Sequence, residues 1–415
     1  MAGGAHQGRD GHVLGIVQAG GKGSRMDVLT RERAKPALPF AGTYQLIDFA
    51  LSAMAHSAIR DVWVSVQYLA SSLDPYLAGG RPWDLDRTRG GYRRVVPQEG
   101  DGVAESGFSQ GNADDLLRLR AQIEEQAPDH IVVSSADHVF ATDLDRVIAQ
   151  HRERGAECTV VTAEVSKKEA AHNAVVVADA TGLVRRLDYK PSRPSTGVVA
   201  TEVFVYETGM LLDLLDRLRV ELSRSGELED GGIGDFGEHL LPRLVERGKV
   251  QAVPVGTYWR DVGRPETYLA AHRDLLAGKL DVFDVPGRPV LSRWPEWPPA
   301  RVVDGAEVCD SMLSPGCVVE GTVRGSVLSP GVHVRRGAVI EDWVVFRGVE
   351  VEAGAHVGTA LVDRDVVVGR GARVGETSSR RAPTPEEITL VGQDSRVGRR
   401  VEVPAGARLE PGTVA

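Results

Sequence analysis

An aliphatic residue recurs at every sixth position in the C-terminal part of the chain, often with a glycine directly after it. Three groups of positions keep this interval: Val339, Val345, Val351 and Val357; then Val362, Val368 and Val374; then Val391, Val397, Val403 and Leu409. A one-residue slip precedes the second group, and a longer break precedes the third. A period of six is typical of a parallel β-helix, in which each side of a triangular coil points one aliphatic side chain inward. An ordinary strand-rich domain would not hold this period over three stretches. Segment 376–389 breaks the repeat, and we expect it to form a loop.

Residues 12–260 follow a different pattern, in which short β-rich runs alternate with stretches of helical periodicity. The predicted strands cover residues 12–19, 60–68, 130–140, 157–165 and 199–206, and the predicted helices cover residues 44–59, 114–126 and 144–155. This alternation predicts an α/β fold with a mostly parallel sheet that is covered on both faces. Ligands of such sheets bind at the carboxyl ends of the strands. The glycine-rich turn after residue 18, Gln67 and Asp137 all lie at or near such ends.

These two patterns divide the chain into four predicted segments. Residues 1–11 are small and polar, and we expect them to be a disordered tail. The α/β domain is expected to cover residues 12–279 and the β-helix domain residues 301–415. Between them, residues 280–300 are dense in proline and tryptophan, which suits an extended linker packed on a neighbour.

The composition argues against several classes of protein. The chain has 58 acidic and 49 basic residues and a net charge of −9, so non-specific binding of nucleic acid is not expected. Its three cysteines have no C-x-x-C spacing, which argues against a disulfide framework or a zinc site. No apolar run reaches the roughly 18 residues of a membrane span, and the N-terminus lacks the apolar region of a signal peptide. We therefore expect a cytoplasmic protein without a membrane or nucleic-acid partner.

The glycine cluster GIVQAGGKGSRM (15–26) admits two interpretations. It could cradle a phosphate group, or it could only turn the chain between a strand and a helix. In the first case, backbone N–H groups of residues 19–25 would face phosphate oxygens, and Arg25 would grip them in a fork. The cluster alone does not decide between the two.

Three further residues bear on this choice. Lys35 stands in a loop held by Pro36, in a chain with few lysines, and is either a phosphate contact or a solvated loop residue. Asp137 follows an apolar strand, and Asp261 precedes a predicted helix. Each carboxylate could ligate Mg²⁺ or merely cap a helix.

Taken in order and spacing, five stretches resemble the sugar-nucleotide pyrophosphorylases, and among them most nearly the bacterial ADP-glucose pyrophosphorylases. The stretches are AGGKGSRM, LTRERAKPALPFAGTYQLIDFALS, SADH, YKP and YWRDVG. The resemblance covers nearly the whole chain, because that family joins a Rossmann-like domain to a C-terminal left-handed parallel β-helix. It implies a Mg²⁺-dependent reaction in which an NTP and a sugar 1-phosphate give an NDP-sugar and pyrophosphate. It also implies a homo-oligomer, either a dimer or a tetramer.

The resemblance further implies a role for each matching position. The implied nucleotide contacts are Gln18, Ala19, Gly20, Gly21, Gly23, Gln98 and Gly111. The implied catalytic residues are Arg25, Lys35 and Asp137, with Asp137 and Asp261 as the metal ligands. Lys190 would bind the sugar phosphate, since a compact ammonium suits that task, with Tyr189 and Glu202 beside it.

The sequence departs from the family pattern at both ends of this implied site. Tyr189 stands where the family has glutamate before Lys-Pro, and Ala200-Thr201-Glu202 replaces a Ser-Met-Gly run. Gln18 replaces the usual leucine before the glycine turn, which puts the identity of the nucleotide in question. Glu32 replaces a lysine that helps to bind effectors in some family members, which puts allosteric activation in question.

Three hypotheses about function therefore stand side by side. In the first, the chain is an active nucleotidyltransferase with an altered acceptor, such as a sugar-like cyclitol 1-phosphate, as in the valienol-1-phosphate guanylyltransferases that make GDP-valienol. In the second, it makes ADP-glucose for glycogen. In the third, it is a non-catalytic regulatory subunit. Retention of the five charged residues Arg25, Lys35, Asp137, Lys190 and Asp261 argues against the third, and the changed acceptor residues favour the first.

Overall fold

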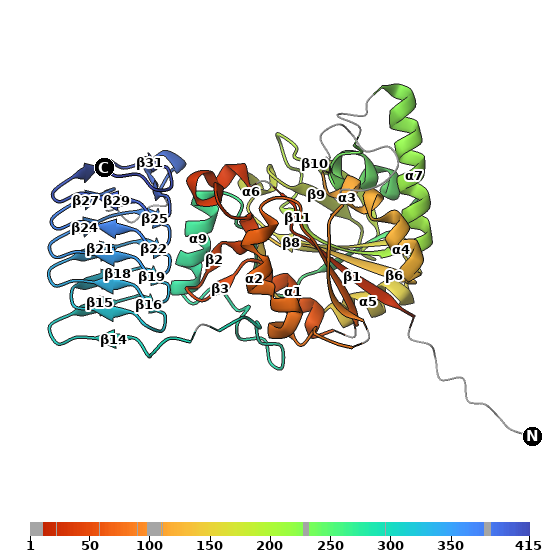
Figure 1. The fold of residues 1–415 in the computed structure, drawn as a ribbon. Helices are drawn as coiled ribbons and strands as arrows, with labels where there is room; N and C mark the ends of the chain where they lie inside the picture. Colours follow the sequence, from red (N-terminus) through yellow and green to blue (C-terminus); the bar gives the residue numbers. More distant parts are fainter. Residues whose placement is uncertain are drawn as a thin grey trace, which may run out of the picture.

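The computed structural model describes residues 11–21, 23–57, 59–88, 90–97, 109, 111–226, 232–294, 296–376 and 383–415. An α/β part and a β-helix lie side by side, and helix α9 runs between them (Figure 1). The predicted tail falls almost wholly on residues outside the described ranges. No helix in the described ranges combines the length and the hydrophobicity that a membrane span requires.

A nine-stranded sheet forms the centre of the α/β part, with the order β10-β9-β11-β6-β1-β4-β5 and with β8 and β12 continuing from β11. Its strands are β1 (Val13–Gln18), β4 (Asp61–Ser65), β5 (Gly91–Val95), β6 (His130–Ser135), β8 (Cys158–Glu164), β9 (Ala174–Ala178), β10 (Val184–Tyr189), β11 (Val198–Glu207) and β12 (Val250–Pro254). Strands β5, β4, β1 and β6 are parallel, as are β8 and β12, while β11 runs antiparallel between β6 and β8. The sheet is Rossmann-like, as predicted.

Alternation along the strands explains why both faces of this sheet are covered. In β1, Leu14 and Ile16 belong to one hydrophobic core and Val17 belongs to the other. The covering helices are α1 (Ile47–Ala55), α2 (Asp74–Leu77), α3 (Asn112–Arg118), α4 (Arg120–Gln126), α5 (Leu144–Glu153), α6 (Lys167–Ala170), α7 (Thr208–Ser225), α8 (Leu241–Glu246) and α9 (Pro265–Leu276). Shorter 3₁₀ and π turns are η1 (Ser24–Thr30), η2 (Lys35–Ala37), η3 (Ala70–Ser72), η4 (Ala78–Trp83) and η5 (Phe236–Leu240).

Three predicted elements differ in the structure. The predicted strand 130–140 is two strands, because the chain turns at Ala136 and Asp137 and β7 (His138–Phe140) pairs with β13 (Trp259–Asp261) in a separate sheet. The predicted helix 114–126 is broken at Leu119 into α3 and α4. The predicted helix 44–59 begins only at residue 47, because residues 44–45 form β3 and pair with β2 (Pro39–Phe40).

The C-terminal part is a parallel β-helix of three six-stranded sheets, the fold predicted from the period of six. The first sheet contains β14 (Arg301–Val302), β17 (Val318–Val319), β20 (His333–Val334), β23 (Glu350–Val351), β26 (Val367–Val368) and β29 (Arg396–Val397). The second contains β15 (Glu307–Cys309), β18 (Thr322–Arg324), β21 (Val339–Glu341), β24 (His356–Val357), β27 (Arg373–Val374) and β30 (Glu402–Val403). The third contains β16 (Met312–Leu313), β19 (Val327–Leu328), β22 (Trp343–Val345), β25 (Ala360–Val362), β28 (Thr389–Val391) and β31 (Arg408–Leu409).

Register within these sheets refines the predicted repeat. Val345 stacks on Val362, seventeen positions later, so the apparent slip recurs once in each coil and is not an irregularity. The inward residue of β21 is Ile340, which is fully buried, and not the predicted Val339, which is half-buried. The predicted interruption lies between β27 and β28, where η6 (Pro385–Glu387) is found, and residues 377–382 fall outside the described ranges.

The β-helix packs directly on the α/β part. Val344, Phe346 and Leu390 of the β-helix belong to the same hydrophobic core as residues of the α/β sheet and helices. Beside them, the buried guanidinium of Arg33 donates to Asp363 Oδ1 at 2.5 Å. This ion pair between the two parts thus involves a residue that stands only two positions before Lys35 in the chain.

The segment 280–300 contains no helix or strand at its described positions, and it packs on the α/β part. The Leu291 carbonyl accepts a hydrogen bond from Trp83 Nε1 at 3.1 Å. Nearby, the hydroxyl groups of Ser292 and Tyr76 lie 2.8 Å apart, and Tyr76 donates to the buried carboxyl group of Asp48 at 2.7 Å. A buried acid therefore lies where this segment crosses helix α1.

Burial raises the pKa of Asp48 to about 7, so its proton is bound more tightly in the folded than in the unfolded chain. The folded form should therefore lose stability as the pH rises from about 4 to about 7. Asp48→Asn has no charge to bury. We therefore expect the free energy of unfolding of this variant, taken relative to that of the wild type, to be higher at pH 8 than at pH 4 by roughly 2 to 4 kcal/mol. Urea unfolding at both pH values measures this difference. The control is Asp284→Asn, because Asp284 is exposed. If Asp48→Asn differed from the wild type by the same free energy of unfolding at both pH values, the raised pKa of Asp48 would be contradicted.

Candidate active site

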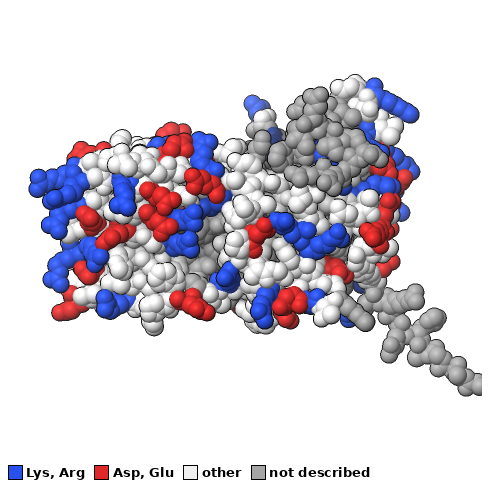
Figure 2. Space-filling model, viewed as in Figure 1, with Lys and Arg blue, Asp and Glu red and all other residues white. Residues whose placement is uncertain are grey.

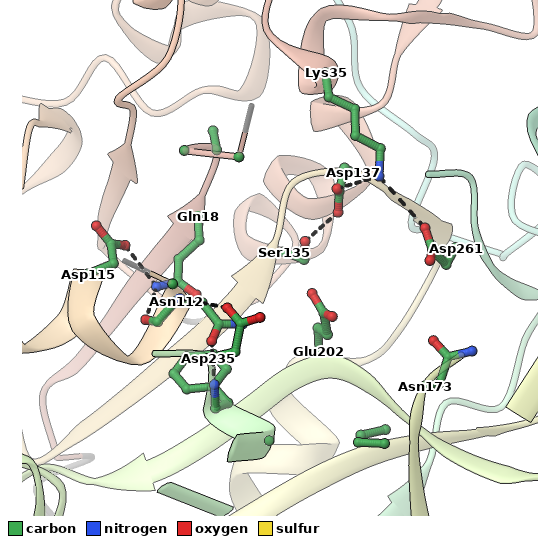
Figure 3. Close-up of a pocket in the computed structure, with 18 of the residues that line it drawn as sticks. Gln18, Lys35, Asn112, Asp115, Ser135, Asp137, Asn173, Glu202, Asp235 and Asp261 are labelled. Atoms are coloured by element: carbon green, nitrogen blue, oxygen red, sulfur yellow. Dashed lines mark hydrogen bonds and ion pairs between the residues drawn. The ribbon is translucent and has the colours of Figure 1, made fainter. Parts of the chain in front are cut away.

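A cavity of about 550 Å³ opens at the carboxyl ends of β1 and β6 (Figure 3). The predicted site residues that line it are Gln18, Ala19, Gly20, Gly21, Arg25, Lys35, Gly111, Asp137, Tyr189, Lys190, Glu202 and Asp261. Gly23 is not among the lining residues, and predicted Gln98 lies outside the described residues. Side chains spread over nearly 250 positions of sequence therefore meet in one cavity.

Lys35 lies at the centre of the charged groups in this cavity. Its side chain is nearly fully buried, and Nζ donates to Asp137 Oδ2 at 2.6 Å and lies 3.7 Å from Asp261 Oδ1. Burial opposes the charge of the ammonium group, but the two carboxylates outweigh it and raise the pKa of Lys35. The alternative of a solvated loop lysine is therefore wrong.

The pairing of two short strands explains why the two aspartates meet. Asp137 occupies the turn between β6 and β7, and Asp261 ends β13, where it stands opposite His138 in the antiparallel register. The alternative that these aspartates cap helices is wrong, because α9 has Arg264 as its N-cap and no helix begins at Asp137.

The carboxyl groups of both aspartates suit a divalent cation. Burial opposes ionisation of Asp137, but the Lys35 ammonium and the nearby His138 ring outweigh it and lower the pKa of Asp137. The pKa of Asp261 is lowered by the same two neighbours against the effect of burial. Two ionised carboxylates facing one cavity are oxygen donors of the kind that Mg²⁺ prefers. The residues present therefore fit the metal that the sequence predicts.

The glycine turn brings the backbone close to this charged cluster. Gly20 and Gly21 line the cavity, and a Cβ atom on Gly21 would contact nothing within 4 Å, so the space beside it is open. Gly23 has a φ of +65°, and a Cβ atom there would lie 2.9 Å from the Cβ atom of Lys35. Gly23 thus allows the turn to pass next to Lys35, although its own role in nucleotide binding stays a prediction. The turn leads into the 3₁₀ helix η1 and not into a regular α-helix.

Gln18 and Gly111 hold the backbone in place where the nucleotide is predicted to bind. The Gln18 amide donates to the Asn112 carbonyl and to Asp115 Oδ2, both at 2.8 Å (Figure 3). Burial raises the pKa of Asp115 to about 6, and Ser65 also donates to this carboxyl group. Gly111 has a φ of +110°, and a Cβ atom there would lie 2.4 Å from the Gly234 carbonyl carbon. Gln18 therefore holds the start of α3 against β1.

Tyr189 and Lys190 lie together in the cavity, where the acceptor is predicted to bind. Lys190 Nζ donates to the Tyr189 hydroxyl at 2.7 Å and stands 4.4 Å from the centre of its ring. The same hydroxyl donates to Asp235 Oδ2 at 3.2 Å. A Cβ atom on Gly237 would overlap the Tyr189 ring, so the chain after Asp235 is fitted to this tyrosine.

Asp235 and Asn173 also line the cavity and were not predicted from the sequence. Asn173 closes the turn that precedes β9, and Asp235 caps η5. The stretch GDFG (234–237), an acidic residue between two glycines, was the available signal for Asp235. Asn173 follows an ordinary short helix, and nothing in the local pattern distinguishes it.

Glu202 holds a strained position in the middle of β11. Its φ is +58°, and the pairing of β11 with β8 is interrupted between Ala200 and Phe204. Figure 3 shows its side chain directed into the cavity, toward the side where Asp137 and Asp261 lie. Desolvation in the cavity raises the pKa of Glu202 although its side chain is 47% exposed, and the neighbouring aspartates add to this rise against the opposing effect of His138.

Ammonium, guanidinium and carboxylate groups at the carboxyl end of a Rossmann-like sheet are typical of enzymes that transfer phosphate-containing groups. Residues 14–278 match the nucleotidyl transferase family, and residues 298–389 match the GlmU-like C-terminal hexapeptide family. The chain therefore belongs to the nucleotidyl transferase family, as a sugar-1-phosphate nucleotidyltransferase of the sugar-nucleotide pyrophosphorylase type. Enzymes of this type generally use a divalent metal.

Several curated relatives are glucose-1-phosphate adenylyltransferases. The protein of this name from Thermomicrobium roseum is 37% identical over 309 residues, which cover 74% of this chain and 70% of the relative. The one from Bacillus licheniformis is 34% identical over 330 residues, covering 79% and 84% of the two chains. The one from Clostridium botulinum is 32% identical over 336 residues, covering 80% and 84%.

Proposed function

We propose that the protein transfers AMP from ATP to glucose 1-phosphate and forms ADP-glucose and pyrophosphate. The observation that carries the proposal is the buried cluster of Lys35, Asp137 and Asp261 beside the glycine turn. The choice of ATP and glucose 1-phosphate is supported by the relatives of that name at 30–37% identity. These relatives favour glucose 1-phosphate over the altered acceptor that Tyr189 and Glu202 suggest in the sequence.

In the proposed reaction, a phosphate oxygen of glucose 1-phosphate attacks the α-phosphorus of ATP, and the bond between the α-phosphorus and its bridging oxygen to the β-phosphate breaks. Arg25 and Lys35 hold the triphosphate, and Lys190 orients the acceptor phosphate toward it. Asp137 and Asp261 would hold Mg²⁺, which would neutralise the negative charge that develops on the triphosphate. Lys35 also keeps the two carboxylates in place through its contacts to both.

A nucleotide panel tests this proposal. The full-length protein is incubated with glucose 1-phosphate, Mg²⁺ and one of ATP, GTP, UTP, CTP or dTTP, and pyrophosphate release is measured. We expect ATP to give a kcat/KM at least tenfold higher than any other nucleotide. A clear preference for GTP would overturn the choice of nucleotide, and no turnover with any nucleotide would favour an altered acceptor or a non-catalytic subunit.

A second candidate is transfer to a different sugar-like 1-phosphate, and the contacts of Tyr189 favour it. Its phenol holds the Lys190 ammonium and bonds to Asp235, so the acceptor lysine lies against an aromatic ring where the family has a carboxylate. The same assay with other hexose and cyclitol 1-phosphates separates the two candidates. Turnover of a cyclitol 1-phosphate that exceeds turnover of glucose 1-phosphate would favour the second.

A further inference from the structure

His138 directs its Nε2 atom at the carboxylates of the active site, and these carboxylates raise the pKa of the ring against the effect of burial. Its side chain is 5% exposed, and its ring packs edge-on against Trp259. Nδ1 lies 3.0 Å from the Thr201 carbonyl oxygen, which can only accept, so Nδ1 carries the proton of that hydrogen bond. Within the described residues, Nε2 has no hydrogen-bond partner. A backbone carbonyl that fixes the tautomer in this way is the usual support of a metal-binding histidine.

Three carboxylate oxygens surround this nitrogen at similar distances. Nε2 lies 3.6 Å from Asp137 Oδ1, 3.9 Å from Asp261 Oδ1 and 4.0 Å from Glu202 Oε2. These distances are too long for hydrogen bonds. Two ligand atoms that each lie about 2.1 Å from one metal ion are at most about 4.2 Å apart. The distances from Nε2 to the Asp137 and Glu202 oxygens lie within this limit.

The contacts of Lys35 leave Asp137 Oδ1 available, whereas the ammonium group also forms an ion pair with Asp261 Oδ1 at 3.7 Å. The ammonium group bonds to Oδ2 of Asp137, whereas Oδ1 of the same carboxylate faces His138. Asp137 Oδ1 accepts one hydrogen bond from Ser135, and Asp261 Oδ1 accepts one from the Gly263 N–H group, so a lone pair remains on each.

The left-handed backbone conformation of Glu202 sets the direction of its carboxylate. A left-handed conformation is unfavourable for a non-glycine residue because its Cβ atom crowds the backbone. Here it turns the carboxylate out of the ladder of β11 and into the cavity. Asp137, His138 and Glu202 each offer a ligand atom, and these atoms all lie within 4.8 Å of one another.

We propose that His138 Nε2 and Glu202 join Asp137 as ligands, so that the protein binds a transition-metal ion such as Co²⁺ or Zn²⁺ more tightly than Mg²⁺ before any nucleotide is present. An imidazole nitrogen favours these ions, whereas Mg²⁺ prefers oxygen donors alone. The proposal deepens the proposed function by extending its metal site. It is tested without substrate, so its outcome is independent of which reaction the protein catalyses.

The experiment measures metal binding by the full-length protein after removal of metals with EDTA. Co²⁺ is titrated in the absence of nucleotide and sugar phosphate, with visible absorption as the readout, and Mg²⁺ is then added as a competitor. We expect Co²⁺ to bind at least tenfold more tightly than Mg²⁺. Glu202→Gln and His138→Gln should each weaken Co²⁺ binding by about 10- to 100-fold. His138→Gln should change Mg²⁺ binding by less than threefold, because Mg²⁺ does not favour the imidazole nitrogen.

Two further variants guard against a merely structural effect. Glu202→Gly removes the ligand and relieves the backbone strain, so it should lose Co²⁺ affinity while its Tm stays equal to or above that of the wild type. Glu164→Gln, an exposed change of the same charge at the end of β8, should leave Co²⁺ affinity unaltered. Equal affinity of the wild type for Co²⁺ and Mg²⁺, or unchanged Co²⁺ binding in both Glu202 variants, would overturn the proposal.

Discussion

Asp137→Asn is expected to lower kcat at least a thousandfold while the protein still folds. The substitution keeps the size of the side chain but removes the charge that pairs with Lys35 and faces the cavity. The amide oxygen can still accept from the Lys35 ammonium, and Asp261 remains 3.7 Å from it, so the lysine keeps a charged neighbour. Pyrophosphate release gives the loss of activity, and circular dichroism with thermal melting reports on the fold.

A matched control for this variant is Asp188→Asn. Asp188 lies on β10, forms a partly exposed ion pair with Arg186 and is not among the residues that line the cavity. Its activity should stay within twofold of the wild type. Survival of Asp137→Asn activity within tenfold of the wild type would contradict the role assigned to this carboxylate.

Asp363→Asn is expected to destabilise the protein by about 3 to 5 kcal/mol, because it leaves the buried guanidinium of Arg33 without its carboxylate. The side chains of Arg33 and Asp363 are only 10% and 2% exposed. Gln393 is the other acceptor that Arg33 uses, and it carries no charge. The midpoint of urea unfolding measures the loss. The kcat should fall as well, because Arg33 stands two residues before Lys35.

Another ion pair between the two parts of the chain supplies the comparison for this variant. Arg273 and Asp342 are 29% and 18% exposed, so Asp342→Asn should cost less than half as much stability. It should leave kcat within twofold of the wild type, since neither residue lies beside Lys35. Equal losses in the two variants would contradict a special role for the Arg33 contact.

On the face drawn in Figure 2, acidic and basic side chains are interspersed over the α/β part and the β-helix.

Local patterns were sufficient to predict most of the fold. A period of six marks inward positions in a β-helix because most sides of a coil have six residues, and alternating β-rich and helical runs mark an α/β sheet. The same patterns could not separate Val339 from Ile340, because both are β-branched aliphatics and the choice depends on the geometry of the corner. Nor could they show the break after β6, since apolar residues continue across the turn into β7.

The candidate site was predictable where a residue belongs to a recognisable stretch, and not where it depends on distant parts of the chain. Lys35 could be singled out from its motif, but its burial arises from Asp137 and Asp261, more than a hundred positions away. The partner of Arg33 lies 330 positions further along the chain. No short-range pattern can predict such a contact.

The most direct test of the central claim is the identity and amount of the products formed from ATP and glucose 1-phosphate. Phosphorus NMR follows both products in one sample of the wild-type protein with Mg²⁺. We predict pyrophosphate and a nucleotide sugar in equal amounts, formed only when both substrates are present. Hydrolysis of ATP to ADP and phosphate, or no reaction with any nucleotide and sugar-like 1-phosphate, would contradict the assignment of this chain as an active nucleotidyltransferase.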